Sequence, residues 1–303
     1  MSFRKLTLSL VAGYCGCSLL VSCGQGSTEG AAAGTDESVL INRQNSSGTY
    51  KYFQESVLDK KDFKANTKDQ SGSQAVVDLV GTMPLAIGYS GMGYKTADVK
   101  FLKVATKEGE TAYEPSVLNA QSGAYPLTRP LQIYTDGEPT GAIGHYVQWI
   151  LSAEGQGIVA DKGYVPLVPK PITISAPNGE QSFQVTGSDT MVQLAQAWAA
   201  SYNAKYPNVK VQVSGGGSGV GIAAMMEGTG DIANASRKMK VTEKAKAEQR
   251  GVKPVEFVVG KDALAVYVHK DNPLPHISVP ALREIYGEGG TISTWQQIPG
   301  YSK

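Results

Sequence analysis

The chain contains little cysteine and little histidine. Its three cysteines all lie near the N-terminus, and they are Cys15, Cys17 and Cys23. Its three histidines lie far apart without the spacing of metal ligands, and they are His145, His269 and His276. After residue 23 the chain therefore has no disulfide, no thiolate zinc site and no cysteine nucleophile. We expect no cofactor and no metal.

An excess of charge of one sign is also missing. The 303 residues include 28 Lys and Arg against 27 Asp and Glu, a formal net charge of +1. Such a balance exerts no general attraction on nucleic acid or on an anionic membrane. We expect no nucleic-acid partner, and any binding of an anion must be local.

The apolar run at residues 6–21 is shorter than the roughly 20 residues that a membrane span needs. It follows Arg4 and Lys5, a pattern typical of a signal peptide, here predicted over 1–23. The sequence "LVSC" resembles the lipobox of bacterial lipoproteins and indicates Cys23 as the lipid attachment site. An ordinary secretory signal cut nearby is the alternative. Residues 24–37 are predicted to be a tether, which places the protein outside the cytoplasm, anchored by lipid to the bacterial membrane.

The rest of the chain alternates strand-like and helix-like segments, which predicts an α/β fold. Strands are expected at 38–44, 86–94, 99–105, 182–187, 209–217 and 261–273. Helices are expected at 49–58, 73–84, 142–163, 190–207, 219–230, 242–250 and 279–289. The proline-rich segment 165–182 suits neither a helix nor a central strand and is expected to be a linker.

Three loops share one design, in which Gly, Ser and Thr lie between a strand and a helix. They are "NSSGT" at 45–49, "TGSDT" at 186–190 and "SGGGSGVG" at 214–221. The first amides of a helix lack intrahelical partners, so such loops can hold an oxyanion. One loop alone is weak evidence because Ser and Thr cap helices generally. Three loops with Arg43 and Arg237 nearby favour one anion site, since guanidinium adds charge-assisted hydrogen bonds.

Other phosphate-binding and catalytic motifs are absent from the sequence. "GGGSGVG" lacks the Gly-Lys-Ser/Thr ending of a P-loop and the spacing of a dinucleotide-binding loop. The sequence contains no G-x-S-x-G nucleophile motif and no carboxylate pair that stands out. We therefore expect a protein that is not an enzyme.

Two long stretches resemble the phosphate-binding proteins (PstS family) of bacterial ABC-type phosphate importers. Residues 183–237, from "FQVTGSDTMVQLAQ" to "DIANASR", resemble the start of that family. "INRQNSSGTYKYFQ", "PLAIGYSGMGY", "SGAYPLTRPLQIYT" and "LSAEGQGIVADKGYVPL" resemble its later part. The order is reversed here, so the chain looks like a circular permutant in which 165–182 joins the family's usual ends. A gene rearrangement with a non-functional product is the alternative, although the well-placed signal and tether argue against it.

The resemblance implies a two-lobed type II periplasmic binding protein fold. Lobe two would combine 38–92 with 270–303, and lobe one would be 93–269, with the strands that cross between lobes near 87–94 and 265–271. The family's Arg-x-x-x-Ser-Gly-Thr motif falls on Arg43, Ser47, Gly48 and Thr49. From lobe one, the implied phosphate ligands are Thr190, the amide of Met191 and Ser218.

One position departs from the family pattern. Where some members have an aspartate that accepts the proton of hydrogen phosphate, this chain has Arg237. Asp189 is a candidate for that role, since a carboxylate would repel sulfate, which carries no proton. A plain helix N-cap is the alternative reading of Asp189.

The implied function is capture of inorganic phosphate for an ABC-type importer, with permease subunits as partners and the chain as a monomer. Two alternatives stay open. One is a phosphate-sensing or surface-interaction lipoprotein without a transport role. The other is a phosphoesterase, which would need a metal set or an activated nucleophile on the same scaffold.

Overall fold

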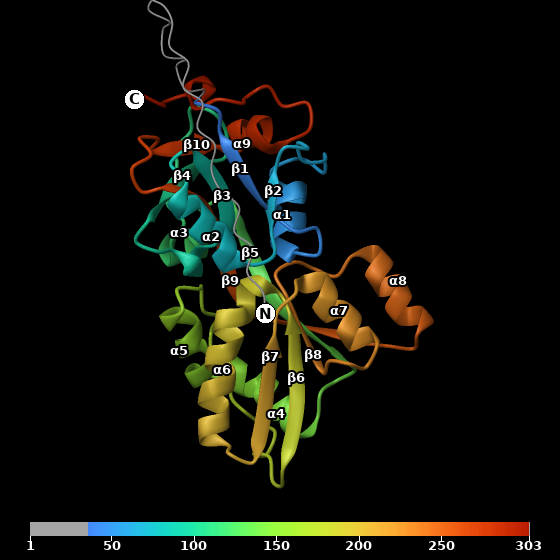
Figure 1. The fold of residues 1–303 in the computed structure, drawn as a ribbon. Helices are drawn as coiled ribbons and strands as arrows, with labels where there is room; N and C mark the ends of the chain where they lie inside the picture. Colours follow the sequence, from blue (N-terminus) through green and yellow to red (C-terminus); the bar gives the residue numbers. More distant parts are fainter. Residues whose placement is uncertain (1–35, 303) are drawn as a thin grey trace, which may run out of the picture. The chain divides into compact units, whose positions relative to one another are not determined.

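Strands and helices alternate along the computed structural model, which describes residues 36–302 (Figure 1). The predicted signal peptide, Cys23 and residues 24–35 of the predicted tether lie outside the described residues. The strands join into one sheet that runs in the order β2-β1-β3-β9-β5-β8-β6-β7, and β4 and β10 extend it beside β9. The mixed α/β fold predicted from the sequence is confirmed.

Two large hydrophobic cores divide residues 36–302 into two lobes, and a smaller third cluster lies in lobe one. Lobe two contains β1 (Val39–Arg43), β2 (Lys68–Gln70), β3 (Ala86–Gly91), β4 (Val99–Ala105) and β10 (His276–Ser278). Lobe one contains β6 (Gln181–Gly187), β7 (Val209–Ser214) and β8 (Ile232–Ala235). Two longer strands are β5 (Thr128–Asp136) and β9 (Pro254–His269). β9 contributes to both cores, whereas β5 contributes Leu131 and Ile133 to the core of lobe one.

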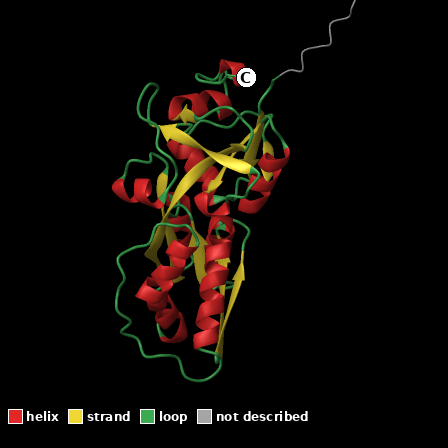
Figure 2. Cartoon of the chain, turned by 90° about the vertical axis from the view of Figure 1, so that its left-hand side faces the viewer, coloured by secondary structure: helices red, strands yellow, loops and turns green. Residues whose placement is uncertain are grey.

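Helices pack against the strands in both lobes (Figure 2). Lobe two has α1 (Gly48–Ser56), α2 (Ser73–Thr82), α3 (Val117–Ser122), α9 (Val279–Tyr286) and the 3-10 turns η1 (Met92–Tyr94) and η3 (Trp295–Gln297). Lobe one has α4 (Gly141–Leu151), α5 (Ala153–Asp161), α6 (Val192–Lys205), α7 (Ser218–Met226), α8 (Val241–Gln249) and the 3-10 turn η2 (Asp189–Met191). Trp149 and Trp198 are buried in the core of lobe one, and Trp295 is buried in the core of lobe two.

The strands β5 and β9 form the hinge between the lobes. They pair antiparallel from Thr128 opposite Ala263 to Asp136 opposite Pro254. At the lobe-two end, Leu127 just before β5 and the residues of β9 after Asp262 belong to the core of lobe two. At the other end, Leu131 and Ile133 of β5 and Val259 of β9 belong to the core of lobe one. In Figure 1 both strands run through the region where the two lobes meet.

The hinge differs from the expected one in both strands. β9 crosses before the expected 265–271, because residues 265–268 already lie in the core of lobe two. The crossing expected near 87–94 is wrong, because β3 and η1 lie wholly in the core of lobe two. Residues 93–127, expected in lobe one, also place their buried side chains there. The actual crossing strand, β5, contains Pro130, which is unusual in a sheet interior. At Pro130 the strand has only β9 as a neighbour, because β8 begins to pair at Gln132.

The helix expected at 142–163 is divided into α4 and α5. Ser152 separates them with an extended backbone, ψ 172°. Gly155 permits the tight turn, since a Cβ there would lie 2.4 Å from the carbonyl oxygens of Trp149 and Ile150. Both helices stay in lobe one, so the break does not move the candidate site.

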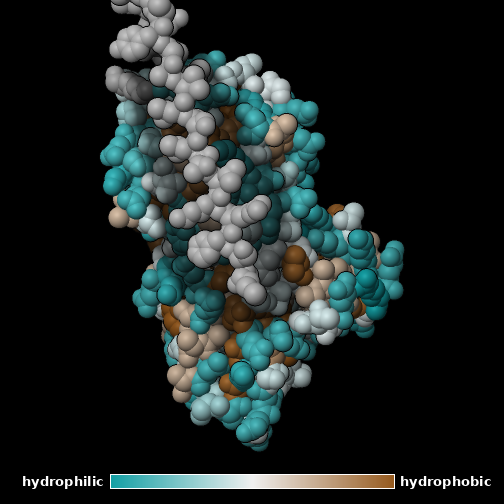
Figure 3. Space-filling view, in the orientation of Figure 1, coloured by the Kyte–Doolittle hydropathy of each residue, from teal (hydrophilic) through white to brown (hydrophobic). Residues whose placement is uncertain are grey.

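The surface seen in Figure 3 is mainly hydrophilic, with hydrophobic atoms in small separate groups. No helix between residues 36 and 302 is both long and apolar enough to cross a bilayer.

Candidate anion-binding site

The three loops predicted to hold an anion meet where the lobes face each other. The carbonyl of Ser46 accepts a hydrogen bond from the amide of Gly219 at 3.1 Å. The hydroxyl of Ser46 donates to the carbonyl of Gly216 at 3.2 Å. The loop before α6 joins them through Thr190, whose hydroxyl lies 2.8 Å from that of Thr49. The N-termini of α1 and α7 and the turn η2 therefore converge, as the sequence predicted.

Arg43, at the end of β1, is fully buried and links the two lobes. Its Nη2 donates to Oδ2 of Asp189 at 2.8 Å, and its Nη1 donates to Oγ of Ser73 at 2.8 Å. The other oxygen of Asp189 accepts from the amide of Gly216 at 2.8 Å. Burial lowers the pKa of Arg43, Asp189 opposes this shift, and the charge of Arg129 adds to it. The Nε of Arg43 has no hydrogen-bond partner among the described residues.

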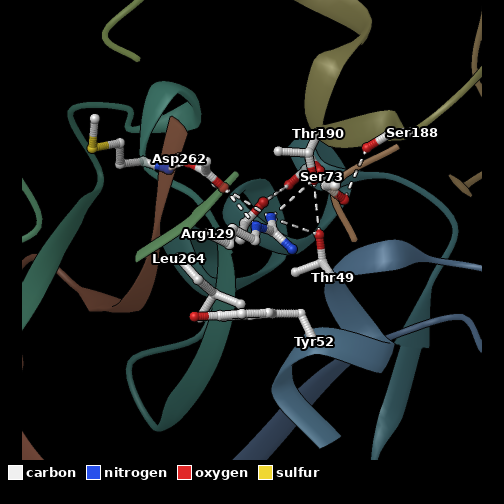
Figure 4. Close-up of polar contacts among 12 residues, drawn as sticks. Thr49, Tyr52, Ser73, Arg129, Ser188, Thr190, Asp262 and Leu264 are labelled. Carbon is white, nitrogen blue, oxygen red and sulfur yellow. Dashed lines mark hydrogen bonds and ion pairs between the residues drawn. The ribbon is translucent and has the colours of Figure 1, made fainter. Parts of the chain in front are cut away.

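A second buried arginine, Arg129, lies beside the cross-lobe threonine pair (Figure 4). Its Nη2 donates to Thr49 Oγ1 at 3.0 Å and to Thr190 Oγ1 at 3.2 Å. Nε and Nη2 also donate to Oδ2 of Asp262, at 3.0 and 2.8 Å. The sequence reasoning did not select Arg129 or Asp262 as site residues. Both belong to the hinge strands.

Four serines and Gly48 lie close together at the junction of the lobes. Ser47 caps α1 by accepting from two amides of its first turn. Ser188 donates to Ser236 at 3.0 Å, and the Ser236 amide donates to the hydroxyl of Ser218 at 3.1 Å. A Cβ on Gly48 would lie 2.2 Å from the hydroxyl oxygen of Ser218 and 2.6 Å from that of Ser236. Only glycine lets the two lobes approach this closely.

Arg237 lies at the edge of this group with a different partner. Its guanidinium makes two hydrogen bonds to the carboxylate of Glu243, at 2.8 and 2.6 Å, and a third to the carbonyl of Lys238. A Cβ on Gly219 would lie 3.6 Å from its Nη2, so Arg237 is near the loops but engaged elsewhere. Its predicted contact with the anion stays a prediction.

Two backbone amides of these loops, including the Met191 amide expected to bind the anion, have partners within the chain. The Thr49 amide donates to the hydroxyl of Ser47 at 3.1 Å, and the Met191 amide donates to the carbonyl of Ser188 at 2.9 Å. A ligand would have to replace these partners.

The chemistry of the site is that of oxyanion binding. Hydroxyl groups, helix N-termini and guanidinium groups all offer hydrogen-bond donors. In the part of the chain that the structure describes, the hydroxyls of these loops are hydrogen-bonded to other hydroxyls, to backbone amides and carbonyls, and to arginines. Among residues 36–302 no group of three or more His, Cys, Asp or Glu is placed to hold a metal ion.

Comparison with known proteins identifies the family. A model of the PBP superfamily domain matches residues 28–154 and 173–303. "Phosphate-binding protein PstS 2" of Streptococcus pneumoniae is 30% identical over 308 residues, which cover 98% of this chain and 100% of that protein. The chain belongs to the PstS family of phosphate-binding proteins.

A solved structure supports the assignment of the chain to this family. The phosphate-binding protein of a phosphate ABC transporter from Streptococcus pneumoniae is 26% identical, has a TM-score of 0.62, and covers 86% of this chain and 99% of its own. "Phosphate-binding protein PstS" of Pseudomonas aeruginosa is 42% identical over 135 residues, 43% of this chain and 42% of that protein. The two-lobed binding-protein fold predicted from the sequence is confirmed.

The order of segments in this PstS chain is shared with one of these relatives. The alignment with the Streptococcus pneumoniae protein covers both chains almost end to end, so the two follow the same order. The circular permutation predicted relative to other family members is not evidenced by this alignment and stays a prediction.

Proposed function

We propose that this PstS-family chain is an extracytoplasmic receptor that captures inorganic phosphate for an ABC-type importer. The observation that carries the proposal is the buried junction of the two lobes, where both lobes supply donors to one place. Arg43 and the first turn of α1 come from lobe two, and Thr190 and Ser218 come from lobe one. An oxyanion held by both lobes would stabilise the form in which they are closed.

The proposed ligand shell follows the family motif and the observed contacts. Arg43 would bind the anion with its Nε, which has no partner among the described residues. Ser47, Thr49, Thr190 and Ser218 would supply hydroxyl groups. Gly48 would let the backbone approach, and the Met191 amide would add a donor. Asp189 would hold Arg43 in place and accept the proton of hydrogen phosphate.

Binding rather than catalysis fits this arrangement, and the members of the family compared above are named as phosphate-binding proteins. Hydrolysis would require an activated nucleophile or a metal-bound water beside the ester. The hydroxyl groups of the site are instead hydrogen-bonded to one another and to arginine.

Calorimetry tests the function directly. The chain from residue 24, freed of carried-over phosphate by unfolding and refolding, is titrated with phosphate and then with sulfate. We expect phosphate to bind, and Arg43→Ala to weaken binding about 100-fold or more, because the variant loses a buried charge-assisted contact. Arg250→Ala is the control, since the Arg250 side chain is half exposed and forms a surface ion pair with Glu227. A cooperatively folded wild-type chain that gives no heat with phosphate would refute the proposal.

The cellular setting is part of the proposal. Relatives in this family are extracytoplasmic. We place the chain on the outer side of a bacterial membrane, held as a monomer by lipid on Cys23, where it delivers phosphate to permease subunits. Labelling with a fatty acid should mark the wild-type chain and not Cys23→Ser. Recovery of permease subunits with the receptor would separate transport from a purely sensory role.

A further inference from the structure

Arg129 and Asp262 form an ion pair inside the hinge itself. They are direct cross-strand partners on β5 and β9, and both side chains are at most 1% exposed. The second oxygen of Asp262 accepts from the Met92 amide at 3.2 Å. The ring of Tyr52 lies 5.3 Å from the guanidinium carbon of Arg129, a cation–π distance. Arg129 is therefore held by the carboxylate of Asp262 and by the ring of Tyr52 (Figure 4).

The same guanidinium contacts one residue from each lobe. Its Nη2 donates to Thr49 of lobe two and to Thr190 of lobe one, and these two hydroxyls are hydrogen-bonded to each other at 2.8 Å. Its Nη1 has no hydrogen-bond partner among the described residues. Arg129 thus contacts both lobes at once, and these contacts can form only when the two lobes are close together.

The donor-only chemistry of arginine fixes the direction of these hydrogen bonds. A guanidinium has five N–H donors and no acceptor, so both threonine oxygens must accept from Arg129. Each hydroxyl has a single proton, and one of the two protons is used in the bond between the threonines. The proton of the other hydroxyl is left to donate, and an oxyanion is the acceptor that suits it.

We propose that Arg129, oriented by Asp262, is a positioning residue for phosphate that acts through Thr49 and Thr190. It turns the threonine pair into a donor toward the anion and joins the lobes at the hinge when they close. This inference rests on the proposed function, because it presumes phosphate as the ligand.

The test is a double-mutant cycle on phosphate affinity. Removing Arg129 alone would leave the buried carboxylate of Asp262 without its counterion, so the variant is Arg129→Met with Asp262→Asn, which keeps an oxygen for the Met92 amide. It is compared with Thr49→Val and with the three substitutions combined. Arg250→Met is the matched control. Thermal unfolding without ligand is measured for every variant, so that loss of affinity is separated from loss of folding.

We expect Arg129→Met with Asp262→Asn to weaken phosphate binding about 10- to 100-fold, the range for one hydrogen bond to a charged group. In the Thr49→Val background the same change should cost much less, because the two act on one hydroxyl pair. Asp262→Asn alone should give a smaller loss, since the guanidinium remains. Two results would overturn the positioning role while leaving the phosphate receptor intact. One is wild-type phosphate affinity in Arg129→Met with Asp262→Asn. The other is a loss of affinity in the combined variant that equals the product of the two separate losses. A wild-type chain that binds no phosphate would overturn both.

Discussion

Two buried arginines near the candidate site, Arg43 and Arg237, are paired with carboxylates in different ways. Arg43 reaches across the lobes to Asp189, 146 residues away in the sequence. Arg237 takes both oxygens of Glu243, six residues later and within lobe one. The first pair depends on how the lobes are placed, whereas the second survives any movement of one lobe against the other. The site should therefore respond strongly to changes at the Arg43 contact and weakly to changes at Arg237.

After the loss of Arg43 itself, the largest effect should come from Gly48→Ala, which keeps the lobes apart at the Arg43 loop. The new Cβ would lie 2.2 Å from the hydroxyl oxygen of Ser218, a distance that real contacts do not reach. Overpacking of about 1–3 kcal/mol predicts phosphate binding that is roughly 5- to 150-fold weaker by calorimetry.

Gly72→Ala is the matched control for Gly48→Ala. Gly72 precedes α2 as Gly48 begins α1, and nothing lies within 4 Å of a Cβ placed on it. The phosphate affinity of Gly72→Ala should equal that of the wild-type chain. Equal affinity for Gly48→Ala as well would mean that the two lobes do not need this close contact to hold phosphate.

The next effect should come from Asp189→Asn, which keeps the shape of the partner of Arg43 but removes its charge. A carboxylate can accept the proton of hydrogen phosphate and repels sulfate, whereas an amide does neither as strongly. We expect the ratio of phosphate to sulfate affinity to fall about tenfold, the size of one charge-assisted hydrogen bond. If titration with both anions shows unchanged rejection of sulfate, Asp189 only orients Arg43.

Local patterns in the sequence indicated some of this site and not the rest. Ser47, Gly48 and Thr49 lie in a motif next to a helix start, so their convergence with Thr190 and Ser218 could be predicted. Arg129 and Asp262 face each other from strands that are 133 residues apart. Their only local signals are a buried charge in "PLTRP" and another in "GKDAL", and neither reveals its partner. The lobe boundary was misplaced for a related reason. Pro130 is atypical of a strand, so the sequence pattern did not predict β5.

The smallest effect on binding should come from Arg237→Gln, because its carboxylate partner is in the same lobe. We expect phosphate affinity within about twofold of wild type, the change that remains when no hydrogen bond to the ligand is lost. A loss as large as that of Arg43→Ala would place Arg237 in the ligand shell.

Arg237→Gln should instead change stability in a manner that depends on pH. Burial opposes ionisation of Glu243, but hydrogen bonds from Arg237 and from the Lys240 amide prevail and lower the pKa of Glu243 below 4.5. A lowered folded-state pKa adds stability above the unfolded-state pKa, and this stability is lost as the pH falls through the folded-state value. Urea unfolding should therefore show the wild-type chain about 1 kcal/mol more stable than the variant at pH 7, a difference that shrinks as the pH falls below about 4.5. A difference that stays constant down to pH 3 would mean that packing of the arginine stem, and not its pairing with Glu243, stabilises this edge of lobe one.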